Sequence, residues 1–190
     1  MTDLTLRHLR VDAAQRGKWN IGFFCAGFLF WLYVGVIAHY FPLATARIYW
    51  IVGTFFIFPF AVLCSKVFGA DPFTKGNALG ELVGYTHMSV ITLTFPIVIV
   101  AALYLPEALI LIMAICYCLD FFVMTWAFGS WLFGIHAIFR TVAATLIFFA
   151  VPDGRLTILP VVVALCYLTT VILILVLRKK WLRDYSPSTV

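Results

Sequence analysis

Apolar residues run along this chain in six long blocks, and the segments before, between and after the blocks hold most of its charged side chains. As a helix, each block is long enough to cross the roughly 30 Å hydrocarbon core of a bilayer, which takes about 18 or more residues. Spanning structures are helices or closed barrels, and the strict apolar–polar alternation of barrel strands is missing. The blocks are residues 19–41, 46–68, 82–105, 108–128, 131–151 and 156–177. The pattern therefore predicts an all-α membrane protein, a bundle of six transmembrane helices.

Composition supports the same class and sets the predicted organisation of the chain. The chain is 64% hydrophobic and 11% charged, whereas soluble domains are about 45–50% apolar and about 25% charged. The connections between blocks are too short for a second domain. We expect an N-terminal arm over residues 1–18, a transmembrane domain over 19–177 and a basic tail over 178–190. Pro59 and Pro96 lie inside two of the blocks and predict a kink in each helix.

The net charge of +5 suits a membrane better than a nucleic acid, because the basic residues follow the membrane topology. With six crossings, ten basic residues lie on the side that holds both termini and two lie on the other side. The positive-inside rule then predicts that both termini are cytoplasmic. The expected partners are the lipid bilayer and anionic lipid headgroups, and we expect no nucleic acid.

Three glycines recur at steps of four residues in the segment KGNALGELVG, which covers residues 75–84. A phosphate-binding P-loop has its lysine after the glycines, and a dinucleotide fingerprint follows a strand, so neither motif fits. On a helix, Gly76, Gly80 and Gly84 would share one face, which lets a second backbone approach closely. The spacing therefore predicts a close helix–helix contact at these glycines.

The same segment predicts where the third transmembrane helix begins. Asp71 and Thr74 are suitable N-cap residues, and Pro72 suits a first helical turn. Lys75 would then stand beside a helix N-terminus, where backbone N–H groups attract anions. An anion contact at Lys75 is therefore an alternative to a purely structural role.

Two charged side chains, Asp120 and Arg140, fall inside predicted spans, where ionisable groups are costly and mark functional sites. Counted from the tight turn at Gly129, they lie at similar depths of about 14 and about 17 Å. His136 precedes Arg140 by one helical turn. We therefore expect an intramembrane polar cluster of Asp120, His136 and Arg140. It either lines a path for a small solute or a proton, or holds two helices together through an Asp120–Arg140 ion pair.

Other chemistry receives less support from the residues. His87 and His136 lie at similar depths, so axial ligation of haem b is an alternative, but we predict no cofactor. The five cysteines all fall inside spans, and their spacing suits neither a disulfide framework nor a metal site. No nucleophile elbow or metalloprotease motif is present, so no catalytic residue is predicted and an enzyme is not favoured.

The segment FPFAVLCSKVFGADPFTKGNALGELVG, residues 58–84, follows an aromatic span that ends in HYFPL. It resembles a family of bacterial multi-pass membrane proteins known as a domain of unknown function, over about residues 20–130. The resemblance implies a small helical protein of the bacterial inner membrane and carries over no catalytic residues. Two functions stay open: a small transporter or channel-like bundle, and a non-transporting interaction or assembly protein. Association of this chain with copies of itself, as a homo-oligomer, also stays open.

Overall fold

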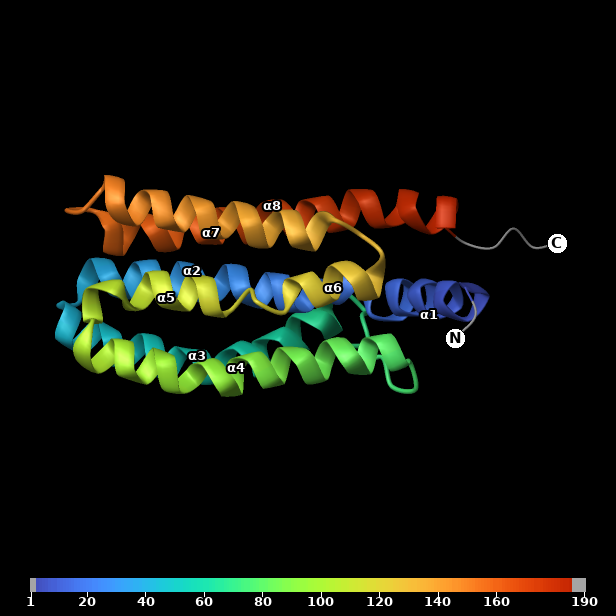
Figure 1. The fold of residues 1–190 in the computed structure, drawn as a ribbon, viewed down its shortest axis with the longest axis horizontal. Coiled ribbons are helices and arrows are strands. Elements are labelled where there is room, and N and C mark those ends of the chain that lie inside the picture. The colour runs from blue at the N-terminus through green and yellow to red at the C-terminus, as the bar shows by residue number, and fades with distance from the viewer. Residues whose placement is uncertain (1–2, 186–190) are drawn as a thin grey trace.

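The computed structural model describes residues 3–185, and all regular structure in this range is helical. Six of its helical segments are long and apolar enough to cross a membrane, which confirms the predicted all-α bundle of a multi-pass membrane protein. Both ends of the described chain lie at the same end of the bundle, here called the terminal end (Figure 1). The six segments are Lys18–Tyr40, Leu43–Val67, Ala78–Tyr104, Pro106–Phe128, Leu132–Ala150 and Arg155–Tyr185.

The helix α2, Ile21–Tyr40, runs along the middle of the bundle (Figure 1) and packs most extensively against α3 and α8. Large aromatic side chains fill this interior, and Trp50 of α3 also donates a hydrogen bond from Nε1 to the Val34 carbonyl of α2 at 3.1 Å. The remaining helices are α1 Asp3–Arg16, α3 Leu43–Val67, α4 Ala78–Tyr104, α5 Leu109–Cys116, α6 Phe121–Phe128, α7 Leu132–Ala150 and α8 Arg155–Tyr185, with short 3-10 helices η1 Lys18–Asn20 and η2 Pro106–Ala108.

The predicted helix contact through Gly76, Gly80 and Gly84 is wrong, because these glycines do not share a packed helix face. Gly76 lies before the helix with a φ of +79°, and a Cβ placed on Gly76 or Gly84 would meet nothing within 4 Å. A Cβ on Gly80 would instead meet the Thr74 side chain of the preceding loop at 2.7 Å. The spacing identified small residues, but it did not show which face a neighbouring helix covers.

The close approach of two helices occurs at Gly22 of α2 instead. A Cβ there would lie 2.5 Å from the backbone nitrogen of Ser65 and 2.6 Å from the Ala61 carbonyl oxygen, both in α3. Small residues four apart stand on both sides of this contact, Gly22 and Ala26 on one helix and Ala61 and Ser65 on the other. This is the small-residue pattern that allows membrane helices to pack closely.

The helix of the third span begins at Ala78, after the predicted caps Asp71 and Thr74 and four residues before the predicted apolar block of 82–105. Asn77 is the N-cap residue, and its side chain accepts hydrogen bonds from the N–H groups of Leu79 and Gly80. The predicted caps at Asp71 and Thr74 are therefore wrong. Thr74 has a φ of +43°, outside the helical range, so the chain becomes helical only after this residue.

The fourth span is not one continuous helix. It divides into α5 and α6, and residues 117–120 form turns between them. The prediction of an uninterrupted helix over residues 108–128 is therefore wrong. By contrast, the helices α3 and α4 are continuous although they contain Pro59 and Pro96. The break places Asp120 directly before α6, about 12 Å along the helix from its end at Phe128.

The predicted N-terminal arm and basic tail pack against each other in their described parts. The helix α8 continues past residue 177 to Tyr185, and Nε of Arg7 donates to the Tyr185 carbonyl at 2.6 Å. Arg178 donates to the Ala14 carbonyl at 3.1 Å. Residues 1–2 of the predicted arm and 186–190 of the predicted tail lie outside the described residues.

Candidate functional site

A cavity of about 560 Å³ lies among α2, α3, α4, the α5–α6 break and α8. It extends from the loop over residues 69–77 to residues at membrane depth. Much of its wall is aromatic, and Phe23, Phe24, Trp31, Phe58, Phe121 and Tyr167 are among the rings. Polar side chains line it at two levels: Lys75 and Glu81 near the loop, and His87 and Asp120 deeper.

The deep polar pair joins α4 to the break in the fourth span. Nδ1 of His87 and Oδ2 of Asp120 are hydrogen-bonded at 2.7 Å. The Asp120 side chain is 1% exposed, and its second oxygen, Oδ1, has no hydrogen-bond partner within residues 3–185. Although Asp120 precedes α6, its side chain does not cap that helix, so Oδ1 has no backbone donor there.

Arg140 of α7 is completely buried and bonds to protein groups behind the cavity wall. It donates to the Tyr167 hydroxyl and, at 2.7 Å, to the Ala114 carbonyl. Its guanidinium also lies over the rings of Phe121 and Tyr167, at 5.4 and 5.2 Å from their centroids. The break explains the Ala114 bond, because carbonyls in the last turn of a helix lack a partner within that helix.

The expected ion pair between Asp120 and Arg140 is therefore wrong: in the described chain the carboxylate pairs with His87, and the guanidinium bonds to Tyr167 and Ala114. The similar depths of the two charges were inferred from an unbroken fourth helix. The break changes the rotation of Asp120 about the helix axis, and a hydrogen bond depends on rotation as well as depth.

His136 lies next to Arg140, as predicted, but does not contact the cavity. Its Nδ1 is 2.6 Å from Oγ1 of Thr170, whose hydroxyl donates to the Cys166 carbonyl. The hydroxyl therefore accepts from Nδ1–H, and Nε2 has no partner among the described residues. Together with Tyr167, His136 and Arg140 form the inner cluster, which is separate from the His87–Asp120 pair.

The sequence identified Asp120, His136 and Arg140 but missed how they are connected. His87 was considered only as a haem ligand, although its depth was a usable signal that it could reach Asp120. Tyr167 and Thr170 gave no signal, because a Tyr or a Thr in an apolar helix is common. His87 lines the cavity and His136 is absent from its described lining, so the two imidazoles do not face one common space. Ligation of haem b by His87 and His136 stays a prediction, and an absorbance spectrum of the purified protein would test it.

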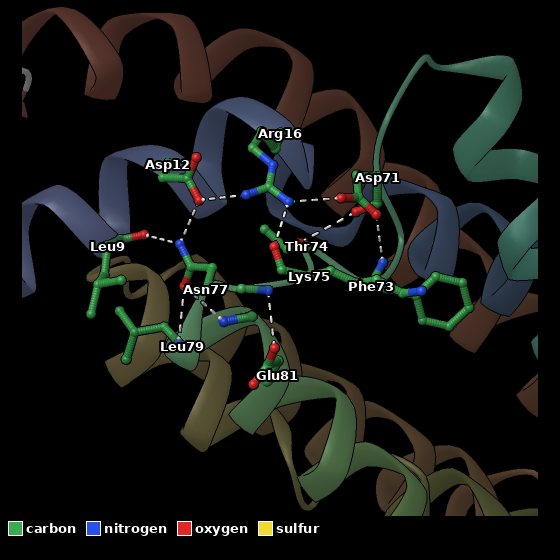
Figure 2. A network of polar contacts seen from close by, with 12 residues as sticks. Leu9, Asp12, Arg16, Asp71, Phe73, Thr74, Lys75, Asn77, Leu79 and Glu81 are labelled. Carbon is green, nitrogen blue, oxygen red and sulfur yellow. Dashed lines mark hydrogen bonds and ion pairs between the residues drawn. The ribbon is translucent and has the colours of Figure 1, made fainter.

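The loop over residues 69–77 is tied to α1 at the terminal end of the bundle, and Figure 2 shows the contacts. Arg16 donates to Asp71 at 3.0 Å, to the Lys75 carbonyl at 2.8 Å and to Asp12 at 3.2 Å. Partial burial opposes ionisation of Asp71, but the hydrogen bonds from Arg16 and from the Phe73 N–H outweigh it and lower the pKa of Asp71. The hydrogen bond to Asp71 also raises the pKa of Arg16, again against partial desolvation.

Asn77 provides a second connection between the loop and α1 (Figure 2). Its Nδ2 donates to the Leu9 carbonyl at 2.8 Å and to Asp12 at 2.7 Å. Pro72, Phe73 and Lys75 of the loop line the cavity, so α1 fixes the position of the cavity mouth.

The backbone N–H groups near Lys75 already donate hydrogen bonds to neighbouring side chains. Glu81 accepts from the Gly76 N–H at 3.0 Å, and Asn77 accepts from the first N–H groups of α4. An anion would have to replace these acceptors or bind the ammonium group alone. The anion contact at Lys75 stays a prediction.

Comparison with known proteins gives one result, from a sequence family. No curated protein matches the chain, and no solved structure matches it. A family described as "Family of unknown function (DUF7010)" matches residues 6–177. This match covers more of the chain than the predicted resemblance over residues 20–130, and it confirms a family known as a domain of unknown function. The chain belongs to this family, DUF7010.

Proposed function

We propose that this protein is a small membrane transporter whose aromatic cavity receives the solute and whose His87–Asp120 pair carries a proton. One observation supports the proposal above the others: the wall of the cavity holds a buried carboxylate with an oxygen that no described residue uses. Ionisable groups at membrane depth that face a cavity are typical of substrate and proton pathways. A carboxylate that only held helices together would be expected to have both oxygens bonded.

The broken fourth span suits the same role. Transporters commonly place their binding sites where a membrane helix is interrupted, because the interruption frees polar groups and allows the two halves to move separately. Here Asp120 lies at the break, and the break contributes to the cavity wall. The terminal end would face the cytoplasm of a bacterial cell, as the ten-to-two distribution of basic residues predicts.

Alternating access can be tested at Ile91, which lines the cavity and lies about 20 Å along α4 from Ala78. Ile91→Cys is made in a chain whose five native cysteines are replaced by alanine. A membrane-impermeant maleimide is then applied to inside-out and right-side-out vesicles. The matched control is Leu93→Cys on the same helix, because Leu93 is 75% exposed on the outer surface of the bundle.

A transporter exposes Ile91→Cys to labelling from both sides of the membrane and leaves Leu93→Cys unlabelled in lipid. Labelling from one side alone would indicate a static cleft, and labelling from neither side a closed bundle. Either of these two results would refute the proposal.

The second candidate, an interaction or assembly protein, is favoured by the inner cluster. Arg140 is completely buried and its described bonds go to groups of the same chain, as expected of a structural charge. Under this hypothesis the cavity is passive and Ile91→Cys is not reached from both sides. Mass measurement of the detergent-solubilised protein would show whether it forms a homo-oligomer.

A further inference from the structure

We propose that the cavity binds a lipophilic organic cation, with the positive charge beside the Asp120 carboxylate and the apolar body among the aromatic rings. This inference rests on the proposed transport function and names its substrate class. At membrane depth, Asp120 contributes a formal negative charge to the described cavity wall, and Arg140 is absent from that wall. A carboxylate oxygen only accepts hydrogen bonds, so its ligand has to supply a donor or a cation.

The aromatic wall selects for the same class. The aromatic residues that line the cavity include Phe23, Phe24, Trp31, Phe58, Phe121 and Tyr167. Ring faces attract cations, most strongly when water is absent, and aromatic cages are the usual binding sites for quaternary ammonium groups. The volume of about 560 Å³ lies within the range of about 300–1,000 Å³ that pockets for drug-sized ligands occupy. A molecule with several apolar rings and one positive charge therefore fits both the size and the chemistry.

An anion fits poorly, because the positive charge behind the wall is already engaged. The Arg140 guanidinium donates to Tyr167 and Ala114 and lies against the Phe121 ring, so an anion in the cavity would meet the Asp120 carboxylate first. The charge of Arg140 lowers the affinity for a cation, and the charge of Asp120 offsets it at closer range. At the mouth, Lys75 and Glu81 have opposite charges and favour neither sign.

The proton on the His87–Asp120 pair would compete with the cation, because both place one positive charge beside the same carboxylate. The titratable and charged groups around the pair are Glu81 and Tyr85 of α4, Lys75 of the loop, Tyr117 before the break, Tyr167 of α8 and Arg140 of α7. A proton on the pair and the bound cation are therefore expected to exclude each other.

The test compares two probe ions of the same shape and opposite charge, tetraphenylphosphonium and tetraphenylborate. Each is titrated into the purified full-length protein in detergent by calorimetry, and the heat measured with protein-free micelles is subtracted. We expect the phosphonium ion to bind and the borate not to bind.

Asp120→Asn should lower the phosphonium affinity by about tenfold or more, the factor expected when a charge-assisted contact is lost. The matched control is Glu107→Gln, which removes a carboxylate that is bonded to Arg155 outside the cavity and should leave the affinity unchanged. If Asp120→Asn does not fold, two other measurements still test the proposal. One is the phosphonium affinity of Asp120→Glu, which keeps the charge. The other is the preference of the unmodified protein for one of the two probe ions.

Equal binding of both ions would mean that the cavity recognises only an apolar body, and preference for the borate would mean an anion site. Either outcome refutes the inference. Absence of phosphonium binding with Ile91→Cys labelled from both sides would refute the substrate class and leave the transporter proposal standing. Phosphonium binding with one-sided labelling would leave a cation-binding cavity and refute transport.

Discussion

Replacing Asn77 by alanine should destabilise the protein more than replacement of a typical surface polar residue. Asn77 is 1% exposed and uses both ends of its amide. Its oxygen accepts from the N–H groups of Leu79 and Gly80 at 3.0 and 3.1 Å, and its nitrogen donates to the Leu9 carbonyl and to Asp12. One side chain therefore caps α4 and connects it to α1.

The magnitude follows from these two functions. Loss of an asparagine N-cap costs about 0.5–2 kcal/mol. The Leu9 carbonyl and the Asp12 carboxylate would also lose the hydrogen bonds from Asn77, which costs about 1 kcal/mol. The sum is about 1.5–3 kcal/mol. For a chain of this length, each kcal/mol lowers the melting temperature by about 2–4 °C, so Asn77→Ala should melt about 3–12 °C below the unmodified protein.

Thermal unfolding in detergent, followed by intrinsic tryptophan fluorescence, measures this difference. Asn77→Asp keeps the capping oxygen but loses both donors and faces Asp12, so it should be destabilised through the α1 contact alone. Thr86→Ala is the matched control on the same helix, because its exposed hydroxyl bonds only to the Leu82 carbonyl one turn earlier. A melting temperature for Asn77→Ala equal to that of Thr86→Ala would show that neither the cap nor the α1 contact contributes.

Three further substitutions test other parts of the structure by the same unfolding assay. Arg140→Leu should lower the melting temperature, because it leaves buried acceptors unpaired. Adding Asp120→Asn to this variant should not raise the melting temperature again. A raised melting temperature would indicate that Asp120 and Arg140 do form an ion pair. Gly84→Ala should be tolerated or stabilise by up to about 1 kcal/mol through helix propensity, because nothing lies within 4 Å of the added Cβ; a large loss would indicate a hidden contact. The lowered pKa of Asp71 means that its bond to Arg16 stabilises the fold above the unfolded pKa of about 3.9 and is lost as the pH falls through the folded pKa. The stability difference between the unmodified protein and Asp71→Asn should therefore be constant above about pH 5 and shrink as the pH falls from about 5 to about 3, and a difference that stays constant over this range would contradict the pairing.

The number of spans could be predicted from the sequence because the length of an apolar block is set by the thickness of the bilayer, independently of tertiary contacts. The break in the fourth span could not, because residues 117–120 contain no proline or glycine. Its unpaired Ala114 carbonyl is satisfied by Arg140, a residue of another helix. A break that depends on a tertiary hydrogen bond leaves no local signal.

The partners of the intramembrane charges could not be predicted from the sequence for a related reason. The observed partners point to different functions for Asp120 and Arg140. The sequence placed Asp120 and Arg140 at similar depths, and His87 at a depth similar to that of His136, but depth does not tell which way a side chain points around its helix. In the structure Arg140 bonds to Tyr167 and Ala114 and is absent from the described cavity wall, whereas Asp120 lines the cavity. Each side chain has one buried atom without a described partner, Nε of Arg140 and Oδ1 of Asp120, so the position beside the cavity distinguishes the two. Loss of Arg140 should therefore be measured first as loss of stability, and loss of Asp120 as loss of cation binding, because ionisable groups at membrane depth that face a cavity mark ligand pathways.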